Sequence, residues 1–430
     1  MFPLRLKKFY RFCKDGIFVI GFIETEGSIF CRVNEILYRI LEKQYYFSQE
    51  DVYSFLKGFD YDSINKALAF LSKNRELFFA KKPGEMRPKQ LPTITTMTLN
   101  LTYICNLRCD YCFEGTSTSK QRSMKSEIAF LAIDLFVEQL KGGMGKIILT
   151  GGEPLIEKDL VVELIKYAKQ RNICFLIKTN ATLLTPELTS FFVGEKNVKL
   201  QVSLDGDEET TNMHRKDMHG KGCYEKVFDT LKNIRKSFPD YYSSITVNSV
   251  VTKETAERLS RNIEMFESIG IKKYGFKPAM ESVLSLDEIA RKKYVCDYYW
   301  PALQKGANQK EDNCCGIGYE HICIDYDGKI YPCYRLCGRD EYIIGDIIEN
   351  GLDIKVNHRL ASIYTRNQDE ECSNCYSLAV CTSGCYSDKL IEENKCDDLA
   401  KAIFDDVIEY DLVMEDRFRF LPILQEDTDR

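Results

Sequence analysis

Strand-like and helix-like segments alternate regularly through the middle of the chain. The segments rich in apolar and β-branched residues lie near residues 96–103, 146–149, 173–177, 198–203, 244–251 and 272–277. The segments with helical spacing of apolar residues lie between them, near residues 125–141, 158–170, 186–193, 222–236 and 254–268. Such alternation is typical of parallel strands joined by crossover helices. It predicts an α/β fold whose six strands form a partial (β/α)6 barrel, open on one side, with functional residues at the carboxyl ends of the strands.

Three cysteines follow the first of these strands. Cys105, Cys109 and Cys112 form a C-x3-C-x2-C pattern, and three thiolates are one fewer than the four that close an ordinary iron–sulfur cluster or structural zinc site. A cubane held by three cysteines leaves one iron open to bind a further ligand. A zinc knuckle is the alternative, but it needs a fourth local ligand, and the next cysteine is Cys174. The pattern therefore favours an open iron–sulfur site.

A glycine-rich segment follows the second strand. Gly151, Gly152 and Glu153 come directly after an apolar run, and such a strand end leaves backbone amides and carbonyls free to hold a small zwitterion. Together with the cysteine loop, this segment resembles the radical S-adenosylmethionine (SAM) superfamily, over about residues 97–278. The resemblance implies that the open iron chelates the amino and carboxylate groups of the methionyl part of SAM, and that the Gly-Gly-Glu segment binds the amino group.

The resemblance also implies further cofactor contacts at the same end of the sheet. Ser203 and Arg215 are expected to contact the ribose and the carboxylate of SAM, since a hydroxyl suits a ribose diol and a guanidinium forks onto a carboxylate. Tyr111, inside the cysteine loop, is expected to pack near the adenine. Asn180 either hydrogen-bonds the cofactor or terminates the third strand, and the sequence leaves both roles open.

Ten cysteines lie between Cys314 and Cys396. The best-defined spacing among them is C-x2-C-x5-C-x3-C followed by one further cysteine: Cys372, Cys375, Cys381, Cys385 and Cys396. Upstream, Cys315 is followed by Gly328 and Cys333 in a C-x12-G-x4-C pattern. The whole field resembles the SPASM domain, which implies two auxiliary 4Fe–4S clusters and, with the cluster of the cysteine loop, three clusters in all.

The family pattern implies one ligand set for each auxiliary cluster. The distal cluster would be held by Cys372, Cys375, Cys381 and Cys396. The proximal cluster would be held by Cys315, Cys333 and Cys385. Either Cys314, Cys323 or Cys337 fills the remaining position, or that iron is open to a substrate thiolate; tandem zinc ribbons would instead need closed sets of four. The single cysteines elsewhere are predicted to be structural, because free cysteine packs as a small hydrophobe: Cys13, Cys31, Cys174, Cys223 and Cys296.

The first 85 residues form a separate block. Ile17–Ile23 and Ser28–Val33 predict a β-hairpin, and three helices follow, the second opened by a capping box at Ser48 and the third capped by Asp62 or Ser63. A hairpin with three helices resembles the winged-helix-like element with which peptide-modifying enzymes bind a leader peptide as an added strand. A packing extension and a DNA-reading wing are the alternatives, and the acidic hairpin disfavours DNA.

The net charge of −6 and the pI near 5.6 argue against nucleic acid as a partner. The apolar run near residues 16–23 is too short to span a membrane and ends at Glu24 without a cleavage site for a signal peptidase. The chain is therefore expected to be cytoplasmic, and in that compartment its eighteen cysteines indicate metal binding and not disulfides. The predicted parts are a leader-recognition domain, a linker, the radical SAM barrel, a bridging helix, the SPASM domain and a C-terminal helix with a tail: residues 1–85, 86–93, 94–285, 286–312, 313–400 and 401–430.

These resemblances imply a maturase of ribosomally made peptides. One electron from a flavodoxin or ferredoxin would lead to cleavage of SAM, and the 5′-deoxyadenosyl radical would abstract hydrogen from a precursor peptide. The first expectation for the product is a thioether between a cysteine sulfur and a carbon, of the sactipeptide or ranthipeptide kind. The alternatives are a C–C or C–O (cyclophane-type) cross-link, formylglycine formation as in anaerobic sulfatase maturation, and a non-catalytic iron–sulfur electron carrier.

Overall fold

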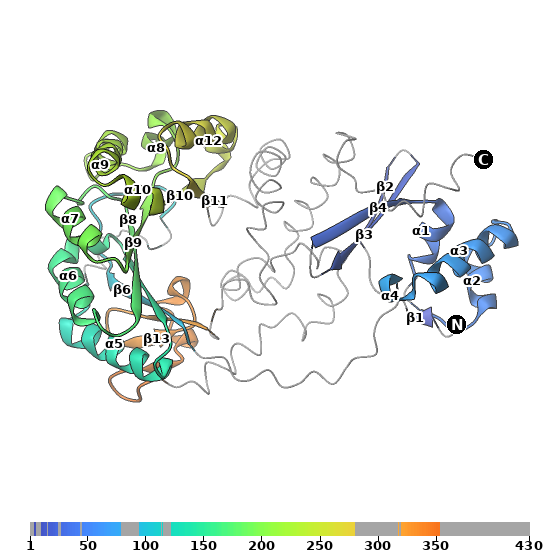
Figure 1. Cartoon of the computed structure of the whole chain (residues 1–430), viewed down its shortest axis with the longest axis horizontal. Helices are drawn as coiled ribbons and strands as arrows, with labels where there is room; N and C mark the ends of the chain where they lie inside the picture. The colour runs from blue at the N-terminus through green and yellow to red at the C-terminus, as the bar shows by residue number, and fades with distance from the viewer. Residues whose placement is uncertain are drawn as a thin grey trace. The chain divides into compact units, whose positions relative to one another are not determined.

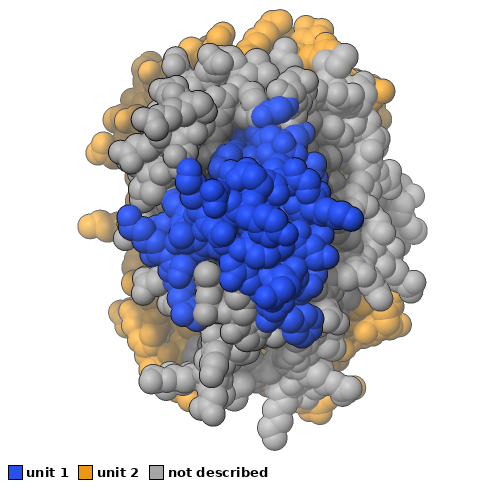
Figure 2. All heavy atoms as spheres, turned by 90° about the vertical axis from the view of Figure 1, so that its right-hand side faces the viewer, with its two compact units in different colours: residues 1–90, 366–384, 395–430 blue, residues 91–365, 385–394 orange. Residues whose placement is uncertain are grey.

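The computed structural model describes residues 4–5, 10–14, 16–24, 27–43, 45–78, 94–112, 114, 122–279, 317 and 320–352. The chain divides into two compact units (Figure 2). The described part of the first unit ends at Phe78, and that of the second unit begins at Ile94. The predicted linker, the bridging helix and most of the C-terminal cysteines lie outside the described residues.

The first unit combines a small antiparallel sheet with helices (Figure 1). Its three-stranded sheet has the order β2-β3-β4, and β1 and β5 pair separately as a two-stranded antiparallel sheet. The strands of this unit are β1 (Leu4–Arg5), β2 (Tyr10–Lys14), β3 (Ile17–Glu24), β4 (Gly27–Val33) and β5 (Tyr45–Tyr46). The helices are α1 (Glu35–Ile40), α2 (Gln49–Phe55), α3 (Tyr61–Lys73) and α4 (Arg75–Phe78). The predicted hairpin is therefore confirmed as β3 and β4, and β2 adds a strand that the periodicity did not indicate.

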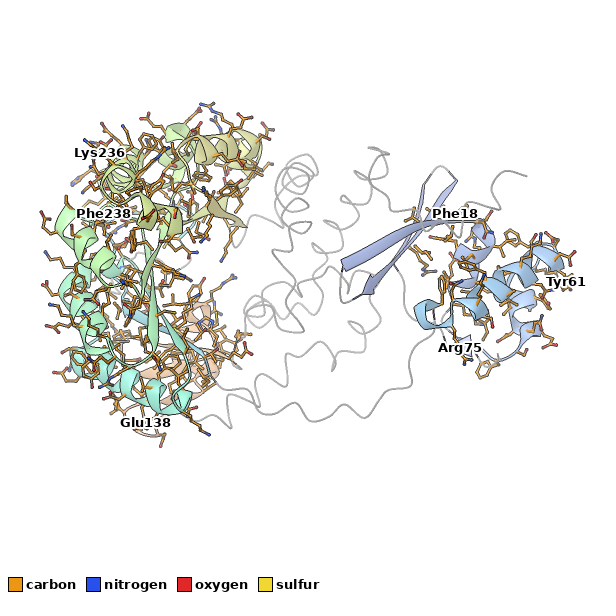
Figure 3. All side chains as sticks on the ribbon, in the orientation of Figure 1. Phe18, Tyr61, Arg75, Glu138, Lys236 and Phe238 are labelled. Carbon is orange, nitrogen blue, oxygen red and sulfur yellow. The ribbon has the colours of Figure 1, made fainter. Side chains whose placement is uncertain are left out.

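The core of the first unit is apolar. Ile20 on β3 and Leu71 on α3 are fully buried in one cluster with side chains of α1 and α2. The rings of Phe18 and Tyr38 lie 5.1 Å apart and join the sheet to α1 (Figure 3). Burial of this apolar surface holds the helices against the sheet.

Side-chain caps begin α1, α2 and α3 of this unit. Asn34 accepts a hydrogen bond from the amide of Leu37 at 2.9 Å, and Ser48 caps α2 as predicted. The expectation that Asp62 or Ser63 caps α3 is wrong: Asp60 is the cap, and its carboxylate accepts from the amide of Ser63 at 2.8 Å. The helix begins at Tyr61, directly after Asp60, so both candidates already lie in its first turn.

The second unit contains the predicted parallel sheet, whose strands occur in the spatial order of the sequence, β6 to β11. These strands are β6 (Thr96–Thr102), β7 (Gly145–Gly151), β8 (Ile173–Thr179), β9 (Val198–Ser203), β10 (Thr246–Val251) and β11 (Lys273–Pro278). All neighbouring pairs are parallel. The α/β fold class and the six parallel strands are therefore confirmed.

Helices lie along the outer side of this sheet (Figure 1). They are α5 (Ser126–Leu140), α6 (Lys158–Tyr167), α7 (Pro186–Gly194), α8 (Glu208–His214), α9 (Tyr224–Ser237), α10 (Pro239–Ser244), α11 (Lys253–Ala256) and α12 (Leu259–Ser268). A 3-10 turn, Pro154–Glu157, precedes α6. Phe175 and Leu200 on the strands and Leu164 on α6 are almost fully buried between the two layers. The opposite face of the sheet is the lumen of the barrel.

The sheet continues beyond β6. Strand β12 (His321–Ile324) pairs with β6 in parallel, and β13 (Lys329–Tyr331) and β14 (Gly345–Asp346) follow antiparallel. Short 3-10 turns at Tyr334–Leu336 and Asp340–Tyr342 connect them. The described part of the predicted SPASM range therefore shares one sheet with the barrel. Within the described residues no helix is long and apolar enough to cross a bilayer.

Candidate active site

The cysteine loop leaves β6 and is held at its start by the end of β7. The amide of Gly152 donates to the carbonyl of Thr102 at 2.7 Å, and that of Glu153 donates to the carbonyl of Ile104 at 2.9 Å. Gly151 has φ of +132°, and a Cβ there would lie 2.2 Å from the Thr102 carbonyl oxygen. A Cβ on Gly152 would lie 2.4 Å from the oxygen of Ile104. The two glycines therefore let the strand end pack directly on the backbone of the loop.

Glu153 is a buried carboxylate that ties this segment to β8. It accepts hydrogen bonds from the hydroxyl of Thr179 at 2.7 Å, the amide of Asn180 at 2.7 Å and the amide of Leu155 at 3.0 Å. Burial raises the pKa of Glu153 to about 7, while these three donors oppose the rise. The carboxylate keeps room for a further donor, since an ionised carboxylate accepts at about four positions.

Asn180 links β8 to the cysteine loop. Its side-chain amide donates to Asn106 Oδ1 at 3.0 Å and points at Cys105 Sγ from 4.0 Å. Its oxygen accepts from both the amide and the hydroxyl of Thr182. In this structure Asn180 therefore positions the loop.

On the other side of the loop, Asp205 is the centre of a buried polar cluster. Its carboxylate accepts from Arg215 through Nε at 2.9 Å and Nη2 at 3.1 Å, from the Tyr111 hydroxyl and from the amide of Val250 at 2.9 Å. Burial opposes the charge on Arg215, but Asp205, Tyr111 and Cys109 together outweigh it, and the pKa of the guanidinium rises well above its ordinary value. The third nitrogen, Nη1, lies 4.0 Å from Cys109 Sγ.

The donor set of the loop fits an iron–sulfur cluster. Burial raises the pKa of Cys105 to about 11 and that of Cys109 to about 12. Each sulfur nevertheless has donors directed at it: the amide of Leu107 at 3.4 Å and Asn180 for Cys105, and Arg215 for Cys109. Such donors stabilise the thiolate form of the sulfur. Binding of a cluster requires that form, and it would release the protons that the free thiols hold. Across the described residues, no three Cys, His, Asp or Glu side chains are close enough to share a single ion.

The structure brings most of the sequence-predicted residues to this end of the sheet. Cys105, Glu153 and Asn180 form one group, and Cys109, Tyr111 and Arg215 form another around Asp205. Ser203 is the last residue of β9 and is paired in register with Asn248 of β10. Arg215 was expected to bind the carboxylate of SAM with two nitrogens. In this structure its Nε and Nη2 donate to the carboxylate of Asp205 instead.

Sequence reasoning gave Asp205 no role. Its position directly after a strand and ten residues before an arginine is the signal that could have found it. Lys178, on the lumen side of β8, was also given no role. Its pKa is lowered to about 8, chiefly by burial.

The C-terminal cysteines are described only in part. Cys323 on β12 is fully buried, and its sulfur lies 3.5 Å from that of Cys337, which follows the turn after Cys333. Burial raises the pKa of both Cys323 and Cys337. The other predicted ligands lie outside the described residues: Cys314, Cys315, Cys372, Cys375, Cys381, Cys385 and Cys396.

Comparison with known families gives two matches within the chain. The model of the radical SAM superfamily matches residues 99–266, and the model of the SPASM iron–sulfur cluster-binding domain matches residues 314–376. The first range contains the cysteine loop, the Gly-Gly-Glu segment and Arg215.

Curated relatives are similar over about two thirds of the chain. A cysteine-type anaerobic sulfatase-maturating enzyme of Clostridium novyi is 26% identical and aligns with 66% of this chain and 86% of its own length. The mycofactocin maturase of Mycolicibacterium smegmatis is 21% identical, with 68% of this chain and 78% of its own length covered.

Two groups of solved structures share the fold. The structure of anSMEcpe with bound AdoMet has a TM-score of 0.60 at 19% identity and covers 74% of this chain and 97% of its own. Streptococcus suis SuiB bound to its precursor peptide SuiA has a TM-score of 0.55 at 16% identity and covers 91% of this chain and 100% of its own. At such identities these likenesses show the fold alone. The two family matches, together with the clamped cysteine loop, identify the chain as a radical SAM enzyme with a SPASM domain, whose cofactors are SAM and 4Fe–4S clusters.

Proposed function

We propose that this enzyme is a maturase of a ribosomally made precursor peptide, and that it installs an intramolecular thioether between a cysteine sulfur and a carbon. The observation that carries the proposal is the combination of the clamped cysteine loop with a folded first unit that contains a small open sheet. The likeness to SuiB extends over 91% of this chain, whereas that to anSMEcpe extends over 74%. SuiB was solved with a bound precursor peptide, which supports a peptide substrate here.

In this proposal the protein's own residues hold and aim the reaction. Cys105, Cys109 and Cys112 hold the cluster, and Glu153 and Asn180 fix the loop and the cofactor. When bound, the cluster and SAM supply one-electron chemistry that removes a hydrogen atom from an unactivated carbon.

The second group positions the rest of the cofactor. Asp205 keeps Arg215 charged beside Cys109, so that Nη1 is the nitrogen left to face the cluster or the cofactor carboxylate. We assign the ribose to Ser203 and the adenine to Tyr111. Gly151 and Gly152 present backbone groups to the methionyl part.

We further propose the ligand sets for the auxiliary clusters that the family pattern implies, with the proximal iron open to a substrate thiolate. The distal ligands are Cys372, Cys375, Cys381 and Cys396. The proximal ligands are Cys315, Cys333 and Cys385. An open iron would hold the peptide cysteine whose sulfur forms the new bond, and the auxiliary clusters would accept the electron that must leave.

The first unit is proposed to bind the leader. Strands β2 and β4 are the edges of its sheet within the described residues, and an extended peptide can add a strand to such an edge. We place the enzyme in the cytoplasm, with a flavodoxin or ferredoxin as electron donor.

The product's composition tests the proposal. The enzyme, reconstituted with iron and sulfide under anaerobic conditions, would be coexpressed with each short cysteine-containing reading frame that flanks its gene, and the peptides analysed by mass spectrometry and alkylation. A thioether predicts loss of two hydrogen atoms and a cysteine that resists iodoacetamide. A C–C or C–O cross-link also loses two hydrogen atoms but leaves the thiol reactive, and would contradict the thioether.

Sulfatase maturation is the second candidate, and the similarity to the Clostridium novyi enzyme favours it. Its product from cysteine is formylglycine, in which sulfur is lost and oxygen gained. A cysteine-containing sulfatase peptide converted in this way would establish it. If no SAM is cleaved on reduction with dithionite, the chain is an electron carrier and both maturase proposals fail.

A further inference from the structure

The six parallel strands of the barrel carry lysine but no acidic residue. Strands β6 to β11 contain five lysines and neither aspartate nor glutamate. These five residues, here called the lumen lysines, are Lys146, Lys178, Lys199, Lys273 and Lys277. Lysine is depleted in strands, so their shared position requires an explanation.

The strand register places all the lumen lysines on one face. Lys146 of β7 pairs with Cys174 of β8, and Lys199 of β9 pairs with Leu176 of β8. Cys174 and Leu176 are two positions apart and therefore lie on the same face of β8. Lys178 is on the same face of β8 and pairs with Gln201, and from there the register leads through Thr246 to Lys273 and Lys277. Alternate residues of a strand point to opposite faces.

The other face is the one that the helices cover. Its residues Ile147, Ile177 and Val247 are fully buried. Lys199, Lys273 and Lys277 are exposed in the described structure, and Lys146 and Lys178 are half-buried. The face that carries the five lysines is therefore the one that faces the lumen of the barrel.

The lumen lysines have no carboxylate partner in the part of the chain that the structure describes. Lys178 instead lies 4.9 Å from the ring centre of Tyr334, beside the turn that follows Cys333. Burial lowers the pKa of Lys178 most, the charges of Lys277 and Lys146 lower it further, and the nearby Cys333 opposes the shift. Like charges gathered on one concave surface produce a strong positive potential, which attracts anionic ligands.

We propose that the lumen lysines select a peptide with aspartate or glutamate residues around its modification point. Lys178 and Lys277 lie near the carboxyl ends of their strands, the end at which the cysteine loop and Asn180 lie. A carboxylate that reaches Lys178 forms a charge-assisted hydrogen bond and relieves its repulsion from Lys277. A neutral peptide leaves the lysines unpaired, which gives selectivity. This inference rests on the proposed function, because it names the class of peptide that enters the same site.

The test measures binding of a fluorescein-labelled glutamate-rich peptide to the full chain by anisotropy, with the glutamine counterpart as the matched neutral probe. The lumen double variant is Lys178→Gln with Lys277→Gln. The control double variant removes the same charge from the exposed outer side of α9, by Lys226→Gln with Lys236→Gln (Figure 3). We expect the lumen variant to lose roughly tenfold or more in affinity for the glutamate peptide, and the control to bind as wild type.

Each of the following results would overturn the inference. The glutamine peptide could bind as tightly as the glutamate peptide, or the control variant could lose as much affinity as the lumen variant. Tripolyphosphate could also displace the labelled peptide as well as unlabelled glutamate peptide does, which would make the surface a general polyanion site. Absence of binding of the glutamate peptide to the wild type would overturn it as well.

SAM cleavage by the wild type separates this inference from the proposed function. Release of 5′-deoxyadenosine with no effect of the lumen substitutions on binding would remove the inference and leave the function. Lysine-dependent binding without release of the nucleoside would remove the function and leave an acidic-peptide site.

Discussion

The barrel end of the second unit and the core of the first unit are stabilised in different ways. In the first unit, apolar side chains such as Ile20 and Leu71 are buried together, and polar groups such as the Asn34 cap lie at the surface. At the carboxyl ends of the barrel strands, Glu153, Asp205 and Arg215 are buried among hydrogen-bond donors and acceptors.

This difference indicates where function resides. Burying a charge is unfavourable unless it is paired and hydrogen-bonded, and an apolar core would hold the barrel together at least as well. The barrel keeps buried charges where they touch the cysteine loop: Arg215 faces Cys109, and Glu153 fixes Asn180 beside Cys105.

The largest expected effect follows from removing a thiol of the cysteine loop. Cys109→Ala removes one of the three thiolates proposed to hold the cluster. Because the cofactor carries the chemistry, loss of the cluster should lower SAM cleavage by roughly a thousandfold or more. The measurement is 5′-deoxyadenosine formed after anaerobic reconstitution, with iron counted in the same sample. Cys174→Ala on β8 is the matched control, and it should keep both iron and activity. Equal losses in the two variants would show that the loop has no special role.

Asp205→Asn should have the largest effect on stability. The substitution leaves the buried guanidinium of Arg215 without its charge partner, and breaking a buried pair in this way costs about 3–5 kcal/mol. Urea denaturation of the protein without cofactors measures the loss. Glu195→Gln, which removes the surface ion pair with Lys169, should cost no more than ~1 kcal/mol. Similar losses would mean that the Asp205 cluster is no more than a surface-like pair.

The sequence predicts the local features of this comparison better than the long-range ones. Six strands and the hairpin follow from periodicity, which needs only neighbouring residues. The pairing of β12 with β6 joins residues more than two hundred positions apart, and no local pattern indicates it. The partnership of Asp205 with Arg215 joins residues only ten positions apart, but it depends on where α8 ends, and the sequence indicated no helix there.

Boundaries were missed where two elements meet. The predicted strand at 244–251 begins later, at Thr246, because α10 continues to Ser244. The predicted helix at 254–268 is divided into α11 and α12. In both places the competing element is short, and its few residues give too weak a pattern to read.

Glu153 should make the stability of the second unit depend on pH. Its folded pKa of about 7 lies above the ordinary value, so the folded state holds the proton more tightly than the unfolded chain does. The resulting stabilisation is present below the ordinary pKa of the carboxyl and is lost as the pH rises toward about 7, by about 3 kcal/mol in all. Urea midpoints on either side of that window should fall with pH in the wild type. Glu153→Gln should flatten this dependence, and an unchanged slope would assign it to other groups.

The smallest expected effect lies in the first unit. Asn34→Ala removes the side chain that accepts from the amide of Leu37 and should destabilise α1 by about 1 kcal/mol. Asn34→Asp keeps the acceptor and adds a negative charge at the amino end of the helix, so it should unfold as the wild type does. Hydrogen exchange of the α1 amides measures the change locally, and SAM cleavage in the same sample should stay constant. If the alanine variant lowered SAM cleavage, the two units would be coupled energetically, and the separation between the apolar core of the first unit and the polar site of the second would have to be given up.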